Sequence, residues 1–225
     1  MSATAGCSTD MFGLGSQTSC SPRLPSSLPP LRGGAHPPGE PRASRIQLIR
    51  HGRAAAGWDT DADPGLDNVG LAQAEALAER LGSQRPLQIV TSPFRRCQET
   101  AAPLARRWGV TPAIEPLVGE IPSPLGVPMR KRVDWLRRAM TGTWSELGDD
   151  YLAYREAVVG CVAEVGSDTV ITSHFVAINA VIGACLDDDR LVIRSLDNAS
   201  ITVVDTAGGR LSLVAGGHET DTLIR

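Results

Sequence analysis

Short apolar runs, separated by longer amphipathic stretches, make up most of the chain after residue 44. Residues 46–49, 88–91 and 169–172 are rich in aliphatic and β-branched side chains, which is typical of β-strands. Ile114 lies near a further short strand. Residues 115–128 carry several prolines and glycines and are interpreted as a loop.

Apolar residues at helical spacing lie between the first two strands. Asp67 or Asn68 can cap the helix, and Gly82 ends it. The apolar stripe of this helix comprises Leu71, Ala74, Leu77, Ala78 and Leu81. Ser92 and Pro93 are then interpreted as the N-cap and first residue of a second helix that reaches residue 107.

The second half of the chain continues this alternation. Helices are predicted over residues 130–140, 150–165 and 175–186, and the last is apolar apart from Asn179. Terminal strands are predicted at residues 200–204 and 211–214. Strands that alternate with helices predict an α/β domain with a largely parallel sheet.

The first 44 residues differ in composition from the rest. They contain 7 prolines, 6 glycines and 8 serines, and such a segment buries too little apolar area to offset its ordering entropy. We therefore predict a disordered tail at 1–44 and a folded domain at 45–225. The tail could be a targeting arm or the product of a spurious upstream start.

Charge and cysteine content narrow the function classes. The formal net charge of −3 provides no basic field for nucleic acid, and no apolar run is long enough to span a membrane. The 5 cysteines show neither disulfide-scaffold density nor metal-type spacing. The sequence therefore predicts a cytoplasmic protein that binds neither nucleic acid nor membrane.

Chemically capable residues follow three of the predicted strands. Arg50 and His51 follow the first strand, Arg95 and Arg96 follow Ser92 after the second, and His174 follows the strand at 169–172. Because ligands bind beyond the carboxyl ends of parallel strands, these residues are predicted to form an anion site with a histidine nucleophile. Taken singly, each has a simpler reading, such as a core histidine or a solvated arginine pair.

Five blocks in this order resemble the histidine phosphatases of the phosphoglycerate-mutase-like superfamily. The blocks are RHG at 50–52, LDNVGLAQA at 66–74, SPFRRCQETA at 92–101, VITSH at 170–174 and NASIT at 198–202. The third is similar to the family's Ser-x-Leu-x-Arg-Ala-x-x-Thr-Ala block and places Arg96 on its arginine. The resemblance implies a three-layer α/β sandwich, with a mostly parallel central sheet and helices on both faces.

The resemblance also implies a role for each site residue. Arg50, Arg96 and His174 would clamp a phosphoryl group, and His51 would attack phosphorus to form a phosphohistidine. Glu120, in the loop after the third strand, would be the general acid. Glu115 is the weaker candidate for that role. No metal or cofactor is implied, because the arginines supply the positive charge.

Two departures from the family pattern affect the expected site. Cys97 replaces an alanine, and Gly57 stands where an asparagine often contacts phosphate. The stretches typical of true phosphoglycerate mutases are absent after His51.

Three functions follow from these observations. The first is a metal-independent phosphatase for a small phosphate ester or a phosphoprotein. The alternatives are a phosphoglycerate-type mutase and a non-catalytic phosphate-binding domain. Specificity is expected in the insert at 115–148, whose arginines could hold a second anionic group or could simply be solvated.

Overall fold

The computed structural model describes residues 43–57 and 59–217, which belong to the second of two units of the chain, residues 40–225. Most of the predicted tail, at 1–42, lies outside the described residues. Ser44, which the sequence analysis assigned to that tail, is buried and is the first residue of a strand.

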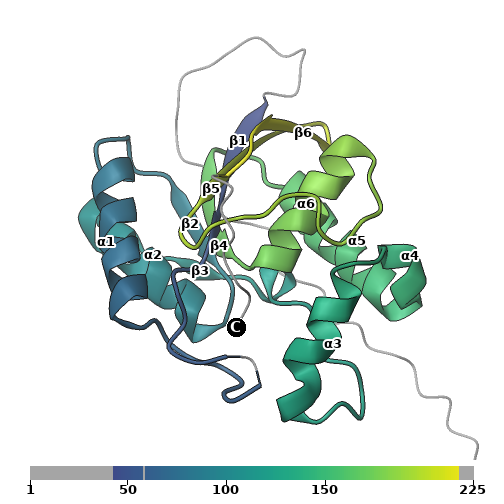
Figure 1. Ribbon diagram of the computed structural model, residues 1–225. Helices are drawn as coiled ribbons and strands as arrows, with labels where there is room; N and C mark the ends of the chain where they lie inside the picture. The colour runs from purple at the N-terminus through teal and green to yellow at the C-terminus, as the bar shows by residue number, and fades with distance from the viewer. Residues whose placement is uncertain (1–42, 58, 218–225) are drawn as a thin grey trace, which may run out of the picture. The chain divides into compact units, whose positions relative to one another are not determined.

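A six-stranded sheet with the strand order β3-β2-β4-β1-β5-β6 forms the centre of the fold (Figure 1). Its strands are β1 (Ser44–Arg50), β2 (Gln88–Thr91), β3 (Ala113–Ile114), β4 (Thr169–Ser173), β5 (Ile201–Ala207) and β6 (Arg210–Ala215). The first four run parallel, and the last two pair antiparallel beyond β1. The largely parallel sheet predicted from the sequence is confirmed.

Helices cover both faces of this sheet (Figure 1). One layer consists of α1 (Asn68–Leu81) and α2 (Arg95–Trp108), and the other of α5 (Asp149–Ala163) and α6 (Phe175–Leu186). The segment between β3 and α5 contains η1 (Pro116–Val118), η2 (Met129–Lys131), α3 (Arg132–Ala139) and α4 (Trp144–Leu147). The three-layer α/β sandwich is therefore confirmed. No helix in the described ranges is long and apolar enough to cross a bilayer.

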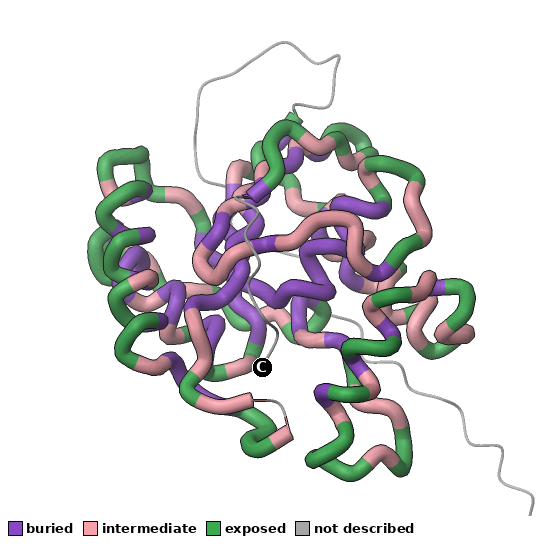
Figure 2. Tube along the Cα trace, in the orientation of Figure 1, coloured by how far each residue is buried: buried purple, intermediate pink, exposed green. Residues whose placement is uncertain are grey.

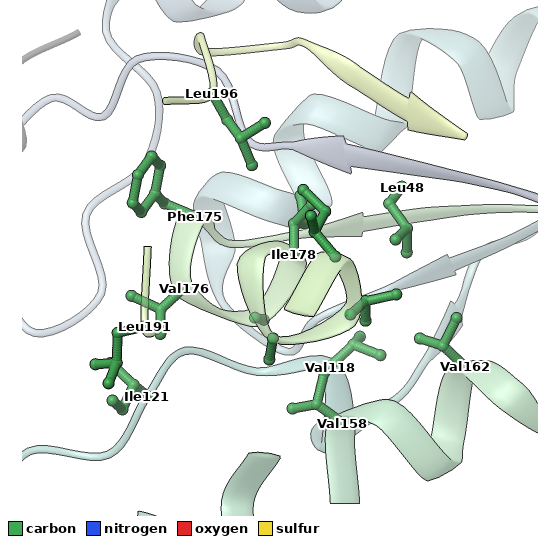
Figure 3. Packing of buried hydrophobic residues seen from close by; sticks show 14 of the residues in the cluster. Leu48, Val118, Ile121, Val158, Val162, Phe175, Val176, Ile178, Leu191 and Leu196 are labelled. Carbon is green, nitrogen blue, oxygen red and sulfur yellow. The ribbon is translucent and has the colours of Figure 1, made fainter. Parts of the chain in front are cut away.

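Successive side chains of the inner strands divide between two hydrophobic clusters. In β4, Val170 belongs to the cluster with α1 and α2, and Ile171 to the cluster with α5 and α6. This alternation places side chains of the inner strands against both helical layers, as expected for a parallel sheet. Figure 2 shows that buried residues concentrate at the centre of the domain. Figure 3 shows Phe175, Val176 and Ile178 of α6 within the second cluster, near Val118 and Leu196.

The start of α2 differs from the prediction. Ser92 and Pro93 are not its N-cap and first residue, because the helix begins at Arg95 and its N-cap is Phe94. The Ser92 hydroxyl is hydrogen-bonded instead to His174 Nε2, at 2.8 Å. A tertiary contact thus overrides a local capping signal.

The N-terminus of α1 packs directly against the loop that follows β1. Asp67 caps the helix by accepting from Gly70 N at 2.8 Å, and its other carboxylate oxygen accepts from Arg53 Nε at 2.6 Å. A Cβ at Gly70 would overlap the Arg53 carbonyl oxygen, so only glycine allows this approach. The residues after β1 are therefore fixed by the helix.

We expect Gly70→Ala to lower the free energy of unfolding by about 1–3 kcal/mol, because the added methyl group displaces the loop at Arg53. Gly160→Ala is the matched control, since a Cβ there meets nothing within 4 Å in the middle of α5. It should raise stability by roughly 0.5–1 kcal/mol. Urea denaturation measures both, and equal effects would contradict the close approach.

Candidate active site

The parallel register of β2, β4 and β1 brings three predicted site segments together. His51 N donates to Ser173 O at 3.0 Å, and Ser92 N donates to Thr172 O at 3.0 Å. The His51 and His174 ring centroids consequently lie 5.3 Å apart. The sheet thus places two histidines from distant parts of the sequence in one buried site.

His51 is held both through its ring and through its main-chain carbonyl. Its Nδ1 lies 2.8 Å from Gly52 O, and its own carbonyl accepts from Asn198 Nδ2 at 3.0 Å. A carbonyl can only accept, so Nδ1 carries the ring proton and Nε2 keeps its lone pair. Burial, together with Arg96 and Arg50, holds the pKa of His51 well below its usual range, so the neutral imidazole is favoured.

The strand predicted at 200–204 begins one residue later, at Ile201, and residues 198–199 form a turn before it. Ala199 has a left-handed backbone, φ 57°, and its N–H donates to Arg50 O at 3.0 Å. That conformation is unfavourable for alanine. Sequence reasoning did not find Asn198 and Ala199 as positioning residues for His51, although it did single out the segment.

Arg50, whose carbonyl accepts from this turn, is a buried residue with 5% of its surface exposed. Nη1 donates to Leu196 O, and the guanidinium lies over the Phe175 ring, 5.1 Å from the centroid. Burial lowers the pKa of Arg50 to about 10, which still leaves the group charged at neutral pH. The site therefore holds a permanent, largely desolvated positive charge.

Arg96 supplies a second positive charge. Its Nη2 lies 3.1 Å from His174 Nδ1 and 3.6 Å from Glu120 Oε2, and its guanidinium lies over the Phe94 ring at 4.7 Å. Arg95 is directed outward, where its exposed side chain pairs with Glu99 at 2.6 Å. Of the two adjacent arginines, Arg96 is the one that lies beside His174 and Glu120.

Glu120 completes the buried cluster. Its Oε2 lies 3.4 Å from His174 Nδ1, while Oε1 accepts from Ile121 N at 3.1 Å. Burial raises the pKa of Glu120 against the opposing effect of Arg96, which favours a protonated acid. The Glu115 carboxylate instead accepts from Leu117 N at 2.9 Å and caps η1. The structure thus brings Glu120, rather than Glu115, to the histidines.

Two side chains that sequence reasoning missed hold the Glu120 loop. Ser173 Oγ donates to Val118 O at 2.7 Å, and Tyr154 Oη donates to Gly119 O at 2.9 Å. The signal for Ser173 was present, because it directly precedes His174 at the end of a strand. Nothing in the local sequence marks Tyr154, which reaches the loop from α5.

The two histidines and Glu120 could also serve as metal ligands. Each offers one atom, and these atoms lie within 4.8 Å of one another. The Arg96 guanidinium, however, lies beside two of the three groups and repels a cation there. The charge distribution therefore suits an anion better than a metal ion.

Comparison with known proteins shows related sequences over much of this domain. The sequence model of the histidine phosphatase superfamily (branch 1) matches residues 46–126 of this chain. This range includes Arg50, His51, Arg96 and Glu120. A protein of Photorhabdus laumondii named probable phosphoglycerate mutase GpmB is 27% identical over 186 residues, which is 72% of this chain and 84% of that protein. A glucosyl-3-phosphoglycerate phosphatase of Mycobacterium tuberculosis is 36% identical over 78 residues, which is 33% of this chain and 35% of that protein.

Solved structures of histidine phosphatases have a similar fold. A mycobacterial glucosyl-3-phosphoglycerate phosphatase in complex with VO3 is 25% identical and superimposes with a TM-score of 0.59. The match covers 77% of this chain and 98% of that one. With the fold, the site and these relatives in agreement, the chain is an enzyme of the histidine phosphatase superfamily, branch 1.

Proposed function

We propose that this enzyme is a metal-independent phosphatase that hydrolyses a phosphomonoester through a phosphohistidine at His51. The observation that carries the proposal is the hydrogen bond between His51 Nδ1 and Gly52 O, 2.8 Å long, because it leaves a neutral nitrogen nucleophile at Nε2. The low pKa of His51 supports the same role.

The two buried arginines would bind the phosphoryl group that His51 attacks. Arg50 and Arg96 offer several N–H donors, and their charge offsets that of the equatorial oxygens. His174 lies between Arg96 and His51 and would contact the same group. Charge neutralisation by side chains is the reason that no metal or other cofactor is proposed.

Proton transfer is assigned to Glu120. In the first step, His51 Nε2 forms a bond to phosphorus, the bond to the leaving oxygen breaks, and Glu120 gives that oxygen its proton. In the second step, the Glu120 carboxylate takes a proton from water, the water oxygen bonds to phosphorus, and the P–N bond breaks. The products are the alcohol, inorganic phosphate and the unchanged enzyme.

The substrate class proposed is a small phosphate ester or a phosphoprotein. One relative is named for a phosphatase of glucosyl-3-phosphoglycerate, which makes that compound the first candidate to assay. A second candidate function is phosphoglycerate mutase activity. The relative named probable phosphoglycerate mutase GpmB matches this chain over 84% of its own length. Product analysis with 3-phosphoglycerate separates the two, since a mutase returns an isomer and a phosphatase releases phosphate.

We expect His51→Ala to lose turnover of p-nitrophenyl phosphate by on the order of 10⁶-fold, as for other removed nucleophiles. Rapid quenching with labelled substrate should trap an acid-labile phosphoenzyme in the natural protein and none in the variant. Hydrolysis should persist in EDTA. Turnover that EDTA abolishes, or labelling that survives in His51→Ala, would contradict the proposal.

Arg96→Ala should lower kcat by on the order of 10²–10³-fold, because the buried guanidinium is a donor to the transition state. Arg95→Ala is the matched control and should change kcat by no more than about twofold, since its side chain is exposed. Steady-state kinetics measures both. Similar losses in the two variants would mean that the wrong arginine has been placed in the site.

Glu120→Gln should slow an alkyl phosphate by on the order of 10²–10⁴-fold, because a poor leaving group needs the proton. It should slow p-nitrophenyl phosphate much less. The raised pKa of Glu120 predicts that turnover of the alkyl substrate falls as pH rises and the acid ionises. This descending limb should be absent from the pH profile of Glu120→Gln. Equal losses on both substrates would exclude the acid role.

A further inference from the structure

His174 has hydrogen-bond partners on both sides of its ring, and together they determine where its proton lies. On the pocket side, Arg96 Nη2 is 3.1 Å from Nδ1. On the opposite side, Ser92 Oγ is 2.8 Å from Nε2. Both His174 and Ser92 are fully buried, with exposed fractions of 0%, so water cannot substitute for either partner.

The arginine decides the tautomer, because a guanidinium has only donors. If Nδ1 carried the proton, two N–H groups would face each other across 3.1 Å. Glu120 Oε2 also lies 3.4 Å from Nδ1, and the raised pKa of this carboxyl group favours a protonated acid that can donate there as well. With Arg96 at the shorter distance, we assign Nδ1 as an acceptor and place the ring proton on Nε2. That proton needs an acceptor, and the Ser92 oxygen is the nearest one.

The remaining contacts of Ser92 fit this direction. The hydroxyl oxygen also accepts from Phe94 N at 3.3 Å. Its own hydrogen can be directed toward Cys97, whose thiol pKa Ser92 lowers. Cys97 Sγ in turn lies 3.5 Å from Ser173 O. The donors His174 Nε2–H, Phe94 N–H and Cys97 S–H then each have an acceptor, as a buried polar network requires.

We propose that Ser92 is a positioning residue for catalysis: it holds His174 as the Nε2–H tautomer, whose Nδ1 accepts from Arg96 and thereby orients that guanidinium in the site. The catalytic part of this inference rests on the proposed function. Without the serine acceptor, Nε2–H is left with the Cys97 sulfur at 3.4 Å, a weak partner. The imidazole ring can then rotate about its bond to Cβ, so that Nδ1 no longer contacts Arg96 and Glu120.

The groups that face His174 come from three elements. Arg96 and Cys97 belong to α2, Arg50 and His51 lie at the end of β1, and Glu120 lies in the loop after η1. Phe94 packs edge-on against the ring, 5.2 Å between centroids. Desolvation and the two arginines lower the pKa of His174, which agrees with a neutral ring that needs a defined tautomer.

Long-range ¹H–¹⁵N spectra of the full-length protein test the tautomer directly, since protonated and unprotonated ring nitrogens differ widely in shift. The chain has only 4 histidines, and His174→Asn identifies the signals of His174 by their loss. We expect the Nε2–H tautomer at neutral pH in the natural protein. Observation of the Nδ1–H form would overturn the inference, whether or not the enzyme hydrolyses any phosphate ester.

Ser92→Ala should shift His174 to a mixture of tautomers and lower kcat by about tenfold, the effect of one lost buried hydrogen bond, with a smaller change in KM. Ser92→Thr keeps the hydroxyl and should retain the tautomer. Thr91→Val is the matched control, because Thr91 is also buried and its Oγ1 donates to the Ser92 carbonyl rather than to His174. It should leave the His174 signals unchanged.

An unchanged tautomer in Ser92→Ala, or the same loss of kcat in Thr91→Val, would show that Ser92 acts only through stability. Should Ser92→Ala not fold, Ser92→Cys keeps the side-chain volume with a weaker acceptor and is judged by the same two readouts. A protein with the expected tautomer but no phosphatase activity would refute the proposed function alone.

Discussion

Arg50 and Arg96 keep two positive charges almost out of water at the carboxyl end of the sheet. Desolvating such ions costs several kcal/mol each unless other groups compensate. A carbonyl oxygen and the Phe175 face compensate Arg50, and the Phe94 face and Glu120 compensate Arg96. Glu120 is itself inclined to be protonated, so the site keeps an excess of positive charge that a phosphoryl group would relieve.

The same charge determines the state of the histidines. Each guanidinium lowers the pKa of both imidazoles, and burial acts in the same direction. A neutral ring can direct a lone pair toward phosphorus, whereas an imidazolium cannot. The charge that attracts the substrate therefore also keeps the nucleophile ready, and hydrogen bonds such as the one to Gly52 O decide which nitrogen is used.

Sequence patterns were sufficient for elements whose stability is local or strongly apolar. The helix at 175–186 and the strand at 88–91 have the predicted bounds, and Asp67 caps α1 as expected. The short helix α4 was missed although Thr143 and Glu146 form a capping box, a signal that the chain does carry. The start of α2 was wrong because the partner of Ser92 is 82 residues away in the chain. The site residues could be named from motifs, but the tilt of each ring and the support from Tyr154 depend on tertiary packing.

The loop that carries Glu120 is fastened on its N-terminal side only a few residues from the acid, through the carbonyls of Val118 and Gly119. Ile121, the next residue, is buried in the core, whereas the following residues up to Lys131 are partly or fully exposed. Insertions and replacements at 122–131 can therefore accumulate without moving the acid. In evolutionary terms, the position of the proposed acid and the exposed part of the loop are separable, so this exposed part is where related chains can diversify at the smallest cost to the proposed chemistry.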